Sequence, residues 1–262
     1  MSQIDVVMFH ASIRPHLWED LYNSISQTNN CSFKMFFCGP KKPNFKLPSN
    51  LIYIYSGEEG VAPCFEIARW HAINEKSKYV MLGPTDDVIM SPGSLDELIE
   101  ELENEKEESL VGFSFKPTIK NPKRNKVINE DVSKDAPLGI MFPLMKRETA
   151  INMGPLDSRF IGVYWDRDLY LRLHTAGINF KTSKSAEASE DMTKQKIPAN
   201  SRPSNKIKRA SREWHDHDIK VINSLWRHDV KANPSNPYFP AKRLIEPEYF
   251  NINHLSFTEY KN

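Results

Sequence analysis

One stretch constrains the fold of this chain more than any other: a run of apolar residues that ends in two adjacent aspartates and is followed by a helix start. It reads Tyr79-Val-Met-Leu-Gly-Pro-Thr-Asp-Asp-Val-Ile-Met-Ser-Pro-Gly-Ser-Leu95. A buried strand followed by a turn, acids and a helix is typical of α/β proteins, which bind ligands at the carboxyl ends of their strands. The pattern therefore predicts a binding site around Asp86 and Asp87.

Asp86 and Asp87 are candidates for holding a divalent metal. Adjacent carboxylates raise each other's pKa unless a cation or hydrogen bonds intervene. Mg²⁺ and Mn²⁺ typically take one or two carboxylates and complete their shell with water and phosphate oxygens. The alternative is an acidic turn that only caps the next helix. The strand before the pair and the helix after it favour a functional site.

Short apolar segments alternate with helical patterns over the first 115 residues. Strands are predicted at residues 4–9, 33–38, 51–55, 79–82 and 110–115. Helices are predicted between them, and the helix after the acid pair should have Ser91 as its N-cap and Pro92 as its first residue. This alternation predicts an α/β fold with a mostly parallel sheet flanked by helices.

The pattern changes after residue 115. Residues 116–137 are polar and basic, which predicts a solvated loop or a lid that helps to hold an anionic ligand. A short strand at 138–142 and a last strand at 178–182 are expected. Residues 183–205 have the composition of a linker or flap. A helix over about 206–230 and an aromatic tail are expected to pack back on the core.

Asp166 and Asp168 form a second acidic cluster, at the start of a predicted helix over residues 164–177. Residues two apart on a helix point about 200° apart, so only one of the two can easily face a cleft. The other would cap its helix or pair with Arg167 or Arg172. A catalytic carboxylate here would act as a general base that takes a proton from an attacking hydroxyl. The alternative is that both serve the helix dipole.

Four segments, in this order, resemble the inverting glycosyltransferases of the GT-A fold, the family-2 type that uses nucleotide-sugar donors. Residues 6–15 resemble the first strand and its Asn-Arg-Pro turn, and residues 60–73 resemble the Gly…Ala-Arg helix. Residues 82–95 resemble the Asp-x-Asp metal motif, and residues 160–177 resemble the acceptor-side segment. The resemblance implies a GT-A-type sheet with a Rossmann-like nucleotide-binding half and an acceptor half.

The resemblance also implies roles for single residues. Asp87 matches the direct metal ligand that bridges to the donor diphosphate, and Asp86 matches the position near the ribose or sugar. Arg14 and Arg69 match positions that bind the donor nucleotide. Asp166 matches the catalytic base that deprotonates the acceptor hydroxyl.

Several positions depart from the family pattern. Thr85 stands where the first acid of Asp-x-Asp is expected. Trp165 replaces the Glu before the base, where its ring could stack on a sugar or belong to the core. Trp165 and Asp168 are assigned to the acceptor side, and Asp168 is expected to be structural. The family's metal-binding His after the acceptor helix is absent, and the candidates to replace it are Glu187, Glu190, His215 and His217.

The resulting hypothesis is a glycosyltransferase of glycan biosynthesis. Residues 1–205 would form the catalytic domain, with 1–115 binding the nucleotide-sugar and 116–205 the acceptor, and residues 206–262 would form a C-terminal helix and tail. The expected reaction moves a hexose from a nucleotide-sugar to an acceptor hydroxyl with inversion, with Mn²⁺ or Mg²⁺ as cofactor. The alternatives are a degenerate GT-A domain that binds a glycan or partner without catalysis, and a sugar nucleotidyltransferase. The latter is disfavoured because no glycine-rich signature follows the first strand.

Composition excludes several other classes. A net charge of +1 and a single basic loop disfavour nucleic-acid binding. No apolar run approaches the roughly 20 residues that a membrane span needs. The three cysteines share no metal-ligand spacing and fit free thiols in a reducing compartment. We therefore expect a cytoplasmic protein without a transmembrane segment, and the aromatic tail is compatible with a homodimer.

Overall fold

The computed structural model describes residues 3–43, 45–58, 60–116, 140–190, 205–227 and 241–260. The strands are β1 (Ile4–Ala11), β2 (Phe33–Gly39), β3 (Leu51–Ser56), β4 (Ser77–Leu82), β5 (Val88–Met90), β6 (Ser109–Lys116), β7 (Met141–Lys146), β8 (Asn179–Glu190) and β9 (Phe257–Tyr260). The helices are α1 (Trp18–Ser26), α2 (Val61–Asn74), α3 (Ser94–Glu103), α4 (Arg147–Asn152), α5 (Trp165–Thr175) and α6 (Asn205–Leu225), and short 3-10 turns lie at Pro15–Leu17 and Ile252–His254.

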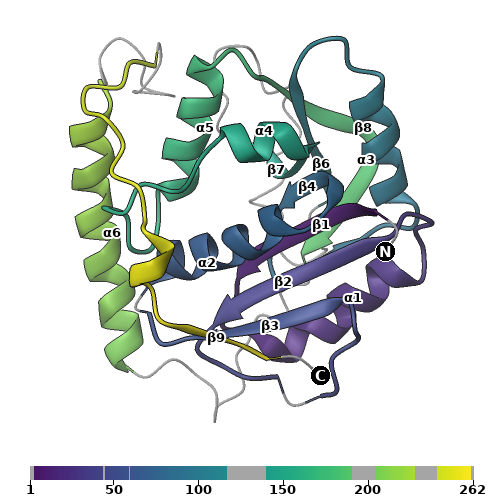
Figure 1. Ribbon diagram of the computed structural model, residues 1–262, viewed down its shortest axis with the longest axis horizontal. Coiled ribbons are helices and arrows are strands. Elements are labelled where there is room, and N and C mark those ends of the chain that lie inside the picture. The colour runs from purple at the N-terminus through teal and green to yellow at the C-terminus, as the bar shows by residue number, and fades with distance from the viewer. Residues whose placement is uncertain are drawn as a thin grey trace.

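Within these residues the strands form one nine-stranded sheet in the order β5-β8-β6-β7-β4-β1-β2-β3-β9 (Figure 1). β1 to β4 pair in parallel through β3-β2-β1-β4, and β6 and β8 run in the same direction beyond the antiparallel β7. β5 and β9 are antiparallel to their neighbours. The sheet is therefore mostly parallel, which confirms the predicted α/β class.

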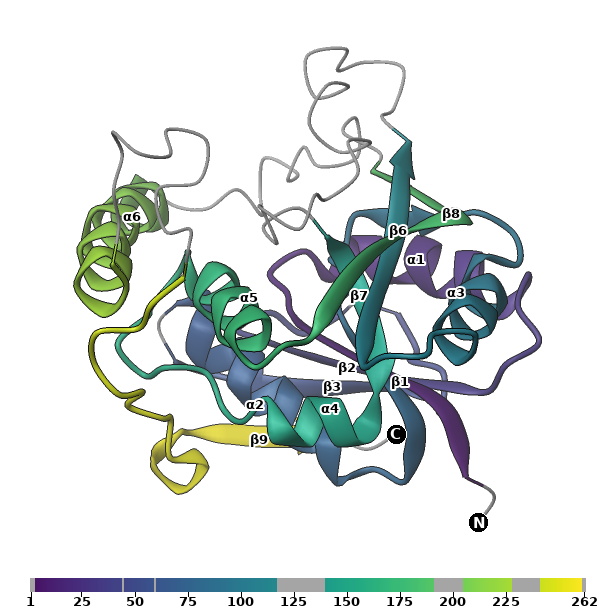
Figure 2. The ribbon, with the colours of Figure 1, turned by 90° about the horizontal axis from the view of Figure 1, so that it is seen from above.

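Helices cover both faces of the sheet (Figure 2). Val6 and Met8 of β1 belong to the core that α1 and α3 close, whereas Val7 and Phe9 belong to the core that α2, α4 and α5 close. Successive side chains of a strand point to opposite faces, so a central strand covered on both sides is apolar throughout. This is why Val6, Val7, Met8 and Phe9 of β1 form an unbroken apolar run.

The start of α3 differs from the prediction. The helix begins at Ser94 with Gly93 as its N-cap, not at Pro92. The Ser91 N–H donates to the Glu187 carbonyl (2.9 Å) and so continues the pairing between β5 and β8. Strand pairing keeps the chain extended up to Ser91, so the helix begins two residues later than predicted.

Strand β8 is longer than predicted. The linker or flap expected from residue 183 is wrong for residues 183–190, which continue the strand and pair with both β6 and β5. Ala186 and Ala188 are fully buried there. Small alanines alternating with polar residues give a weak apolar signal, which explains the error. Residues 117–139 and 191–204, the rest of the two predicted loops, lie outside the described residues.

The C-terminal segment completes the sheet. In Figure 1 it runs from beside α6 to the outer edge, where β9 pairs antiparallel with β3. The Tyr260 ring stacks on Tyr53 with centroids 5.5 Å apart. The predicted packing of the tail on the core thus takes the form of an added edge strand.

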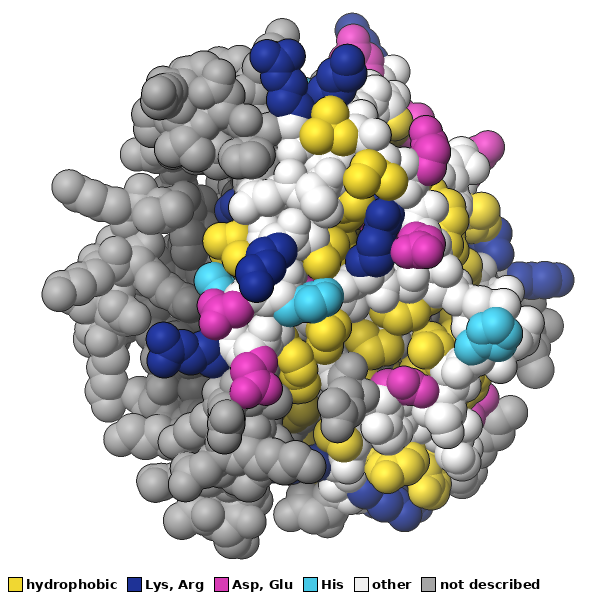
Figure 3. All heavy atoms as spheres, turned by 90° about the vertical axis from the view of Figure 1, so that its left-hand side faces the viewer, with side chains coloured by type: hydrophobic (Ala, Val, Ile, Leu, Met, Phe, Trp, Pro, Cys, Tyr) yellow, Lys and Arg dark blue, Asp and Glu magenta, His cyan; other side chains and the backbone are white. Residues whose placement is uncertain are grey.

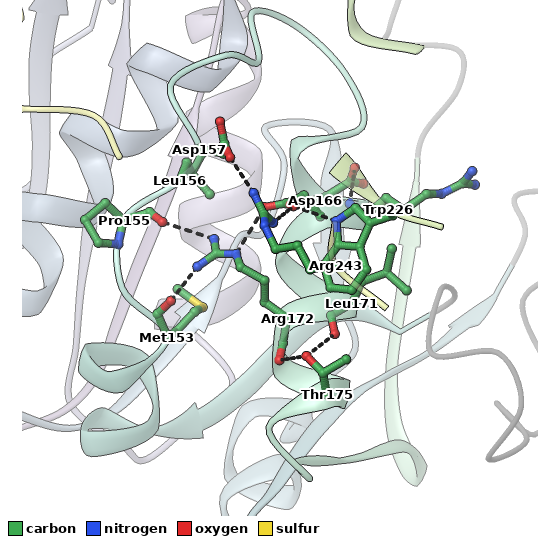
Figure 4. A network of polar contacts seen from close by, with 12 residues as sticks. Met153, Pro155, Leu156, Asp157, Asp166, Leu171, Arg172, Thr175, Trp226 and Arg243 are labelled. Carbon is green, nitrogen blue, oxygen red and sulfur yellow. Dashed lines mark hydrogen bonds and ion pairs between the residues drawn. The ribbon is translucent and has the colours of Figure 1, made fainter. Parts of the chain in front are cut away.

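A buried ion-pair network also ties this segment to α5 (Figure 4). The Asp168 carboxylate accepts hydrogen bonds from Arg172 Nε (3.0 Å) and Trp226 Nε1 (2.8 Å). It also pairs with Arg243. Arg243 reaches Asp157 as well, at 2.5 Å. Asp168 therefore holds α5, the end of α6 and the C-terminal segment together.

We predict that Asp168→Ala lowers the free energy of unfolding by about 3–5 kcal/mol, because removing one partner of a buried ion pair leaves its cations uncompensated. Urea denaturation followed by circular dichroism measures the change. Asp216→Ala is the matched control, since the Asp216 side chain is 68% exposed and its loss should change stability by no more than about 0.5 kcal/mol. Equal effects of the two substitutions would contradict the role given to Asp168.

Candidate functional site

Asp86 and Asp87 lie in the turn between β4 and β5, at the carboxyl edge of the sheet. Both are buried, with 3% and 8% of their surface exposed. β1 and β4 are parallel neighbours, and Phe9 pairs with Leu82. The turn after β4 therefore lies beside the segment that follows β1.

Arg14, in the segment after β1, holds both carboxylates. Its Nη1 donates to Asp87 Oδ2 at 3.0 Å, and its Nη2 pairs with Asp86 Oδ1. Its backbone N–H donates to Asp86 Oδ2 at 3.2 Å. The sequence-predicted donor residues Arg14, Asp86 and Asp87 thus form one cluster.

Ser12 fixes Asp86 from a second direction. Its hydroxyl donates to Asp86 Oδ2 at 2.5 Å and accepts a hydrogen bond from Trp18 Nε1 at 2.7 Å. Burial raises the pKa of Asp86, against the opposing effects of the Arg14 charge and the Ser12 hydrogen bond. These donors favour the charged form of the carboxylate, whereas burial opposes it.

Gly39, at the end of β2, allows the segment that carries Ser12 to pack closely against β2. The Ser12 N–H donates to the Cys38 carbonyl at 2.8 Å. A Cβ at Gly39 would lie 2.0 Å from the Ser12 carbonyl oxygen, so a side chain at this position would push the segment after β1 away.

Asp166 lies in the first turn of α5, with its side chain exposed to solvent. Its Oδ1 accepts the Arg167 N–H at 2.8 Å. Desolvation by the surrounding protein raises the pKa of Asp166 despite that hydrogen bond and the open solvent-facing side. Trp165, half-buried, packs on Phe65 with ring centroids 4.0 Å apart, so its ring is partly core and partly accessible.

His10 lies near the carboxyl end of β1. The charges of Asp86 and Asp87 favour a protonated imidazole, but desolvation by burial outweighs them. The His10 ring lies 6.5 Å from that of Trp165. Burial lowers the pKa of His10, so the ring is neutral at pH 7.

Sequence reasoning did not include His10 among the site residues. A histidine that interrupts an apolar strand near its carboxyl end was the available signal, because that end of a parallel strand faces the binding edge.

The structure gives Arg69 and Asp168 other partners. Arg69 is buried in a bidentate ion pair with Glu66, at 2.8 and 2.7 Å. Glu66 also accepts the Leu156 N–H at 3.0 Å. The donor-binding role of Arg69 stays a prediction, which no contact among the described residues supports. For Asp168, the contacts are those expected of a structural residue.

The candidates for a further metal ligand lie in two places. β8 aligns Glu190 with Val88, so the Glu190 backbone lies beside the turn that carries Asp87. On α6, His215 Nε2 lies 3.2 Å from the Tyr164 hydroxyl at the start of α5. The neighbouring His217 contacts Asp218 at 2.8 Å.

The acid pair fits a hard divalent cation. Arg14 already brings one oxygen of Asp86 and one of Asp87 to a single positive group. With both carboxylates ionised, the single guanidinium leaves the cluster with one formal negative charge. Among the described residues no group of three His, Cys, Asp or Glu side chains is arranged to bind a metal. One or two carboxylates suffice for Mg²⁺ or Mn²⁺ when substrate phosphates and water complete the shell.

The side of the molecule that carries α6 mixes charges of both signs with apolar side chains (Figure 3). Exposed apolar residues of the C-terminal segment include Leu244, Ile245 and Tyr249. The predicted homodimer stays a prediction.

No helix in the described part of the chain is both long and apolar enough to cross a membrane.

No family model matches the chain, and no curated protein matches it by sequence. Among solved structures, it is similar to Staphylococcus aureus TarS 1–349, with a TM-score of 0.52 and 11% identity over 71% of this chain and 60% of that one. A second S. aureus TarS structure gives a TM-score of 0.50 and 10% identity over 72% of this chain and 36% of that one. The catalytic domain of Drosophila β1,4-galactosyltransferase 7 in complex with xylobiose gives a TM-score of 0.42 and 10% identity over 70% of this chain and 66% of that one.

The chain therefore spans less than two thirds of the length of the TarS structures. At such low identity the likeness shows the fold alone. That fold is the GT-A-like fold of glycosyltransferases, as the resemblance in the sequence implied.

Proposed function

We propose that this chain transfers a hexose from a nucleotide-sugar donor to a hydroxyl group of a glycan or another acceptor, with inversion at the anomeric carbon. The observation that carries the proposal is the buried pair Asp86 and Asp87, which Arg14 holds at the carboxyl edge of the sheet, where α/β folds bind ligands. Asp166 on α5 supplies a second acidic group, with its side chain exposed to solvent.

The acid pair suits the donor side of the site. Asp87, with Asp86 beside it, would hold Mn²⁺ or Mg²⁺, and Arg14 adds a guanidinium that suits phosphate oxygens. When bound, the metal supplies stabilisation of the charge that develops on the leaving diphosphate. Burial of the pair strengthens such electrostatic effects, because little water screens them.

Asp166 suits the role of general base. Its side chain reaches solvent, where an acceptor hydroxyl can approach, and its raised pKa makes it a better proton acceptor than an ordinary aspartate. As the acceptor oxygen bonds to the anomeric carbon, its proton passes to Asp166 and the bond to the diphosphate oxygen breaks. Attack opposite the leaving group inverts the configuration. The accessible part of the Trp165 ring is available to stack on a sugar.

A second candidate is a degenerate GT-A domain that binds without catalysis. Thr85 in place of the first acid favours it, because a neutral hydroxyl lacks the negative charge of a carboxylate. Incubation with nucleotide-sugars and Mn²⁺ separates the candidates. Slow hydrolysis of a donor without acceptor supports the transferase, whereas binding without any turnover supports the degenerate domain.

We predict that a nucleoside diphosphate together with Mn²⁺ stabilises the protein. Ligand at about 100 times its dissociation constant adds about 2.7 kcal/mol, which raises the Tm of a chain of this size by about 5–10 °C. A thermal-shift screen of nucleoside diphosphates measures the rise. Asp87→Asn should lose the Mn²⁺-dependent part of the Tm rise. Glu100→Gln, which replaces an exposed acid on α3, should keep it. Loss in both variants would argue against a specific site.

We predict that Asp166→Asn lowers the turnover number of sugar transfer by about 10²–10⁴-fold, because the amide cannot accept the acceptor proton. Donor binding, measured by isothermal titration calorimetry, should change little. Asp216→Asn removes an exposed acid from α6 and should leave turnover unchanged. Full transfer activity in Asp166→Asn would show that Asp166 is not the general base.

We also predict the direction of the pH dependence. Below its pKa, Asp166 carries a proton and cannot act as base, so kcat/KM should rise with pH as the carboxyl ionises. Since desolvation raises this pKa, the midpoint should lie above the ordinary aspartate value of about 3.9. A pH profile of kcat/KM over the range in which circular dichroism shows an intact fold measures it. A midpoint at or below the ordinary value contradicts the assignment.

A further inference from the structure

We propose that the Arg14 guanidinium is the cation that a divalent metal displaces: it pairs with both Asp86 and Asp87 in the donor-free protein and moves to the donor's diphosphate when the metal enters. The inference rests on the proposed function only in taking a nucleoside diphosphate as the anion that receives Arg14. The Arg14 side chain would then couple the binding of the metal to the binding of the donor.

The carboxylate of Asp86 does not depend on the guanidinium for its position. Its Oδ2 is held by the Ser12 hydroxyl at 2.5 Å and by the Arg14 backbone N–H at 3.2 Å. Trp18 Nε1 holds Ser12 in turn. The guanidinium contacts the other oxygen, Oδ1, so it can leave while these two hydrogen bonds keep Asp86 in place.

The guanidinium is the partner best able to move. The Arg14 side chain is 20% exposed, whereas those of Asp86 and Asp87 are 3% and 5% exposed. It extends from the short segment between β1 and the 3-10 turn at Pro15–Leu17. A long side chain at the solvent boundary changes rotamer more easily than two buried carboxylates on a turn fixed to the sheet.

Electrostatics make the exchange cooperative. Two buried carboxylates without a cation are strongly destabilised, so Arg14 leaves only when another cation replaces it. A guanidinium binds phosphate oxygens bidentately, so the diphosphate gives the displaced side chain a new partner. Metal and diphosphate should therefore each raise the affinity for the other by the same factor.

The test is a Mn²⁺ titration of nucleotide-free protein, followed by calorimetry or by the free-Mn²⁺ electron paramagnetic resonance signal. Arg14→Gln removes the competing charge, so its Mn²⁺ affinity should exceed that of the wild type by about tenfold, within the range of about 5–150-fold usual for coupled sites. Arg14→Lys keeps a charge but lacks the fork that spans two carboxylates, so it should fall between the two. Arg212→Gln removes an exposed charge from α6 and should match the wild type.

The second arm repeats the titration with a saturating nucleoside diphosphate. Wild-type affinity for Mn²⁺ should rise, and the rise should be several-fold smaller in Arg14→Gln, because the displacement no longer has to be driven. The double variant Asp86→Asn, Asp87→Asn should bind Mn²⁺ weakly in both arms, which locates the metal at the pair.

Equal or weaker Mn²⁺ binding by nucleotide-free Arg14→Gln overturns the proposal. If circular dichroism shows that this variant does not fold, Arg14→Lys decides instead: tighter binding than wild type supports the exchange, and unchanged binding overturns it. If the protein binds no nucleoside diphosphate under any condition, the proposed function is wrong. The nucleotide-free comparison still decides whether Arg14 competes with the metal.

Discussion

The parallel pairing of β1 with β4 is the interaction on which the candidate site depends. Because Phe9 and Leu82 are partners, the segments that follow them leave the sheet side by side. One carries Ser12 and Arg14, and the other carries the acid pair. The contacts between them are consequences of strand register, so a register shift by one residue would turn the last apolar residues to the wrong face and separate the two segments.

The other half of the site depends on how the chain is held before α5. The Asp218 carboxylate on α6 is fully buried and accepts the backbone N–H groups of Gly162 at 2.7 Å and Val163 at 2.8 Å. Asp168 ties the next turn to the C-terminal segment. Asp166, which lies between these anchors in sequence, is left free to face solvent. Segments from the last third of the chain therefore set the position of the proposed base.

The strands and helices of the first half could be predicted because each is one clear apolar pattern, and the acid pair because it follows such a strand. The partners of single side chains could not. Arg69 sits in a helix that resembles a nucleotide-binding one, yet Glu66, three residues away, is its partner. The end of β8 escaped prediction because Ala186 and Ala188 are too small to mark a strand. His10 was not predicted, because a single histidine near the end of an apolar strand does not by itself indicate which groups lie near it.

The buried aspartates differ in what balances their charge. Asp157, Asp168 and Asp218 are balanced by groups the fold holds in place, such as backbone N–H groups and arginines that each bridge several elements. Asp86 and Asp87 share the single positive charge of Arg14. A carboxylate of the first kind can only stabilise the fold. A pair of the second kind has more negative charge than its partner can balance when both carboxylates are ionised, so it still attracts a cation, and this separates a binding site from a structural ion pair.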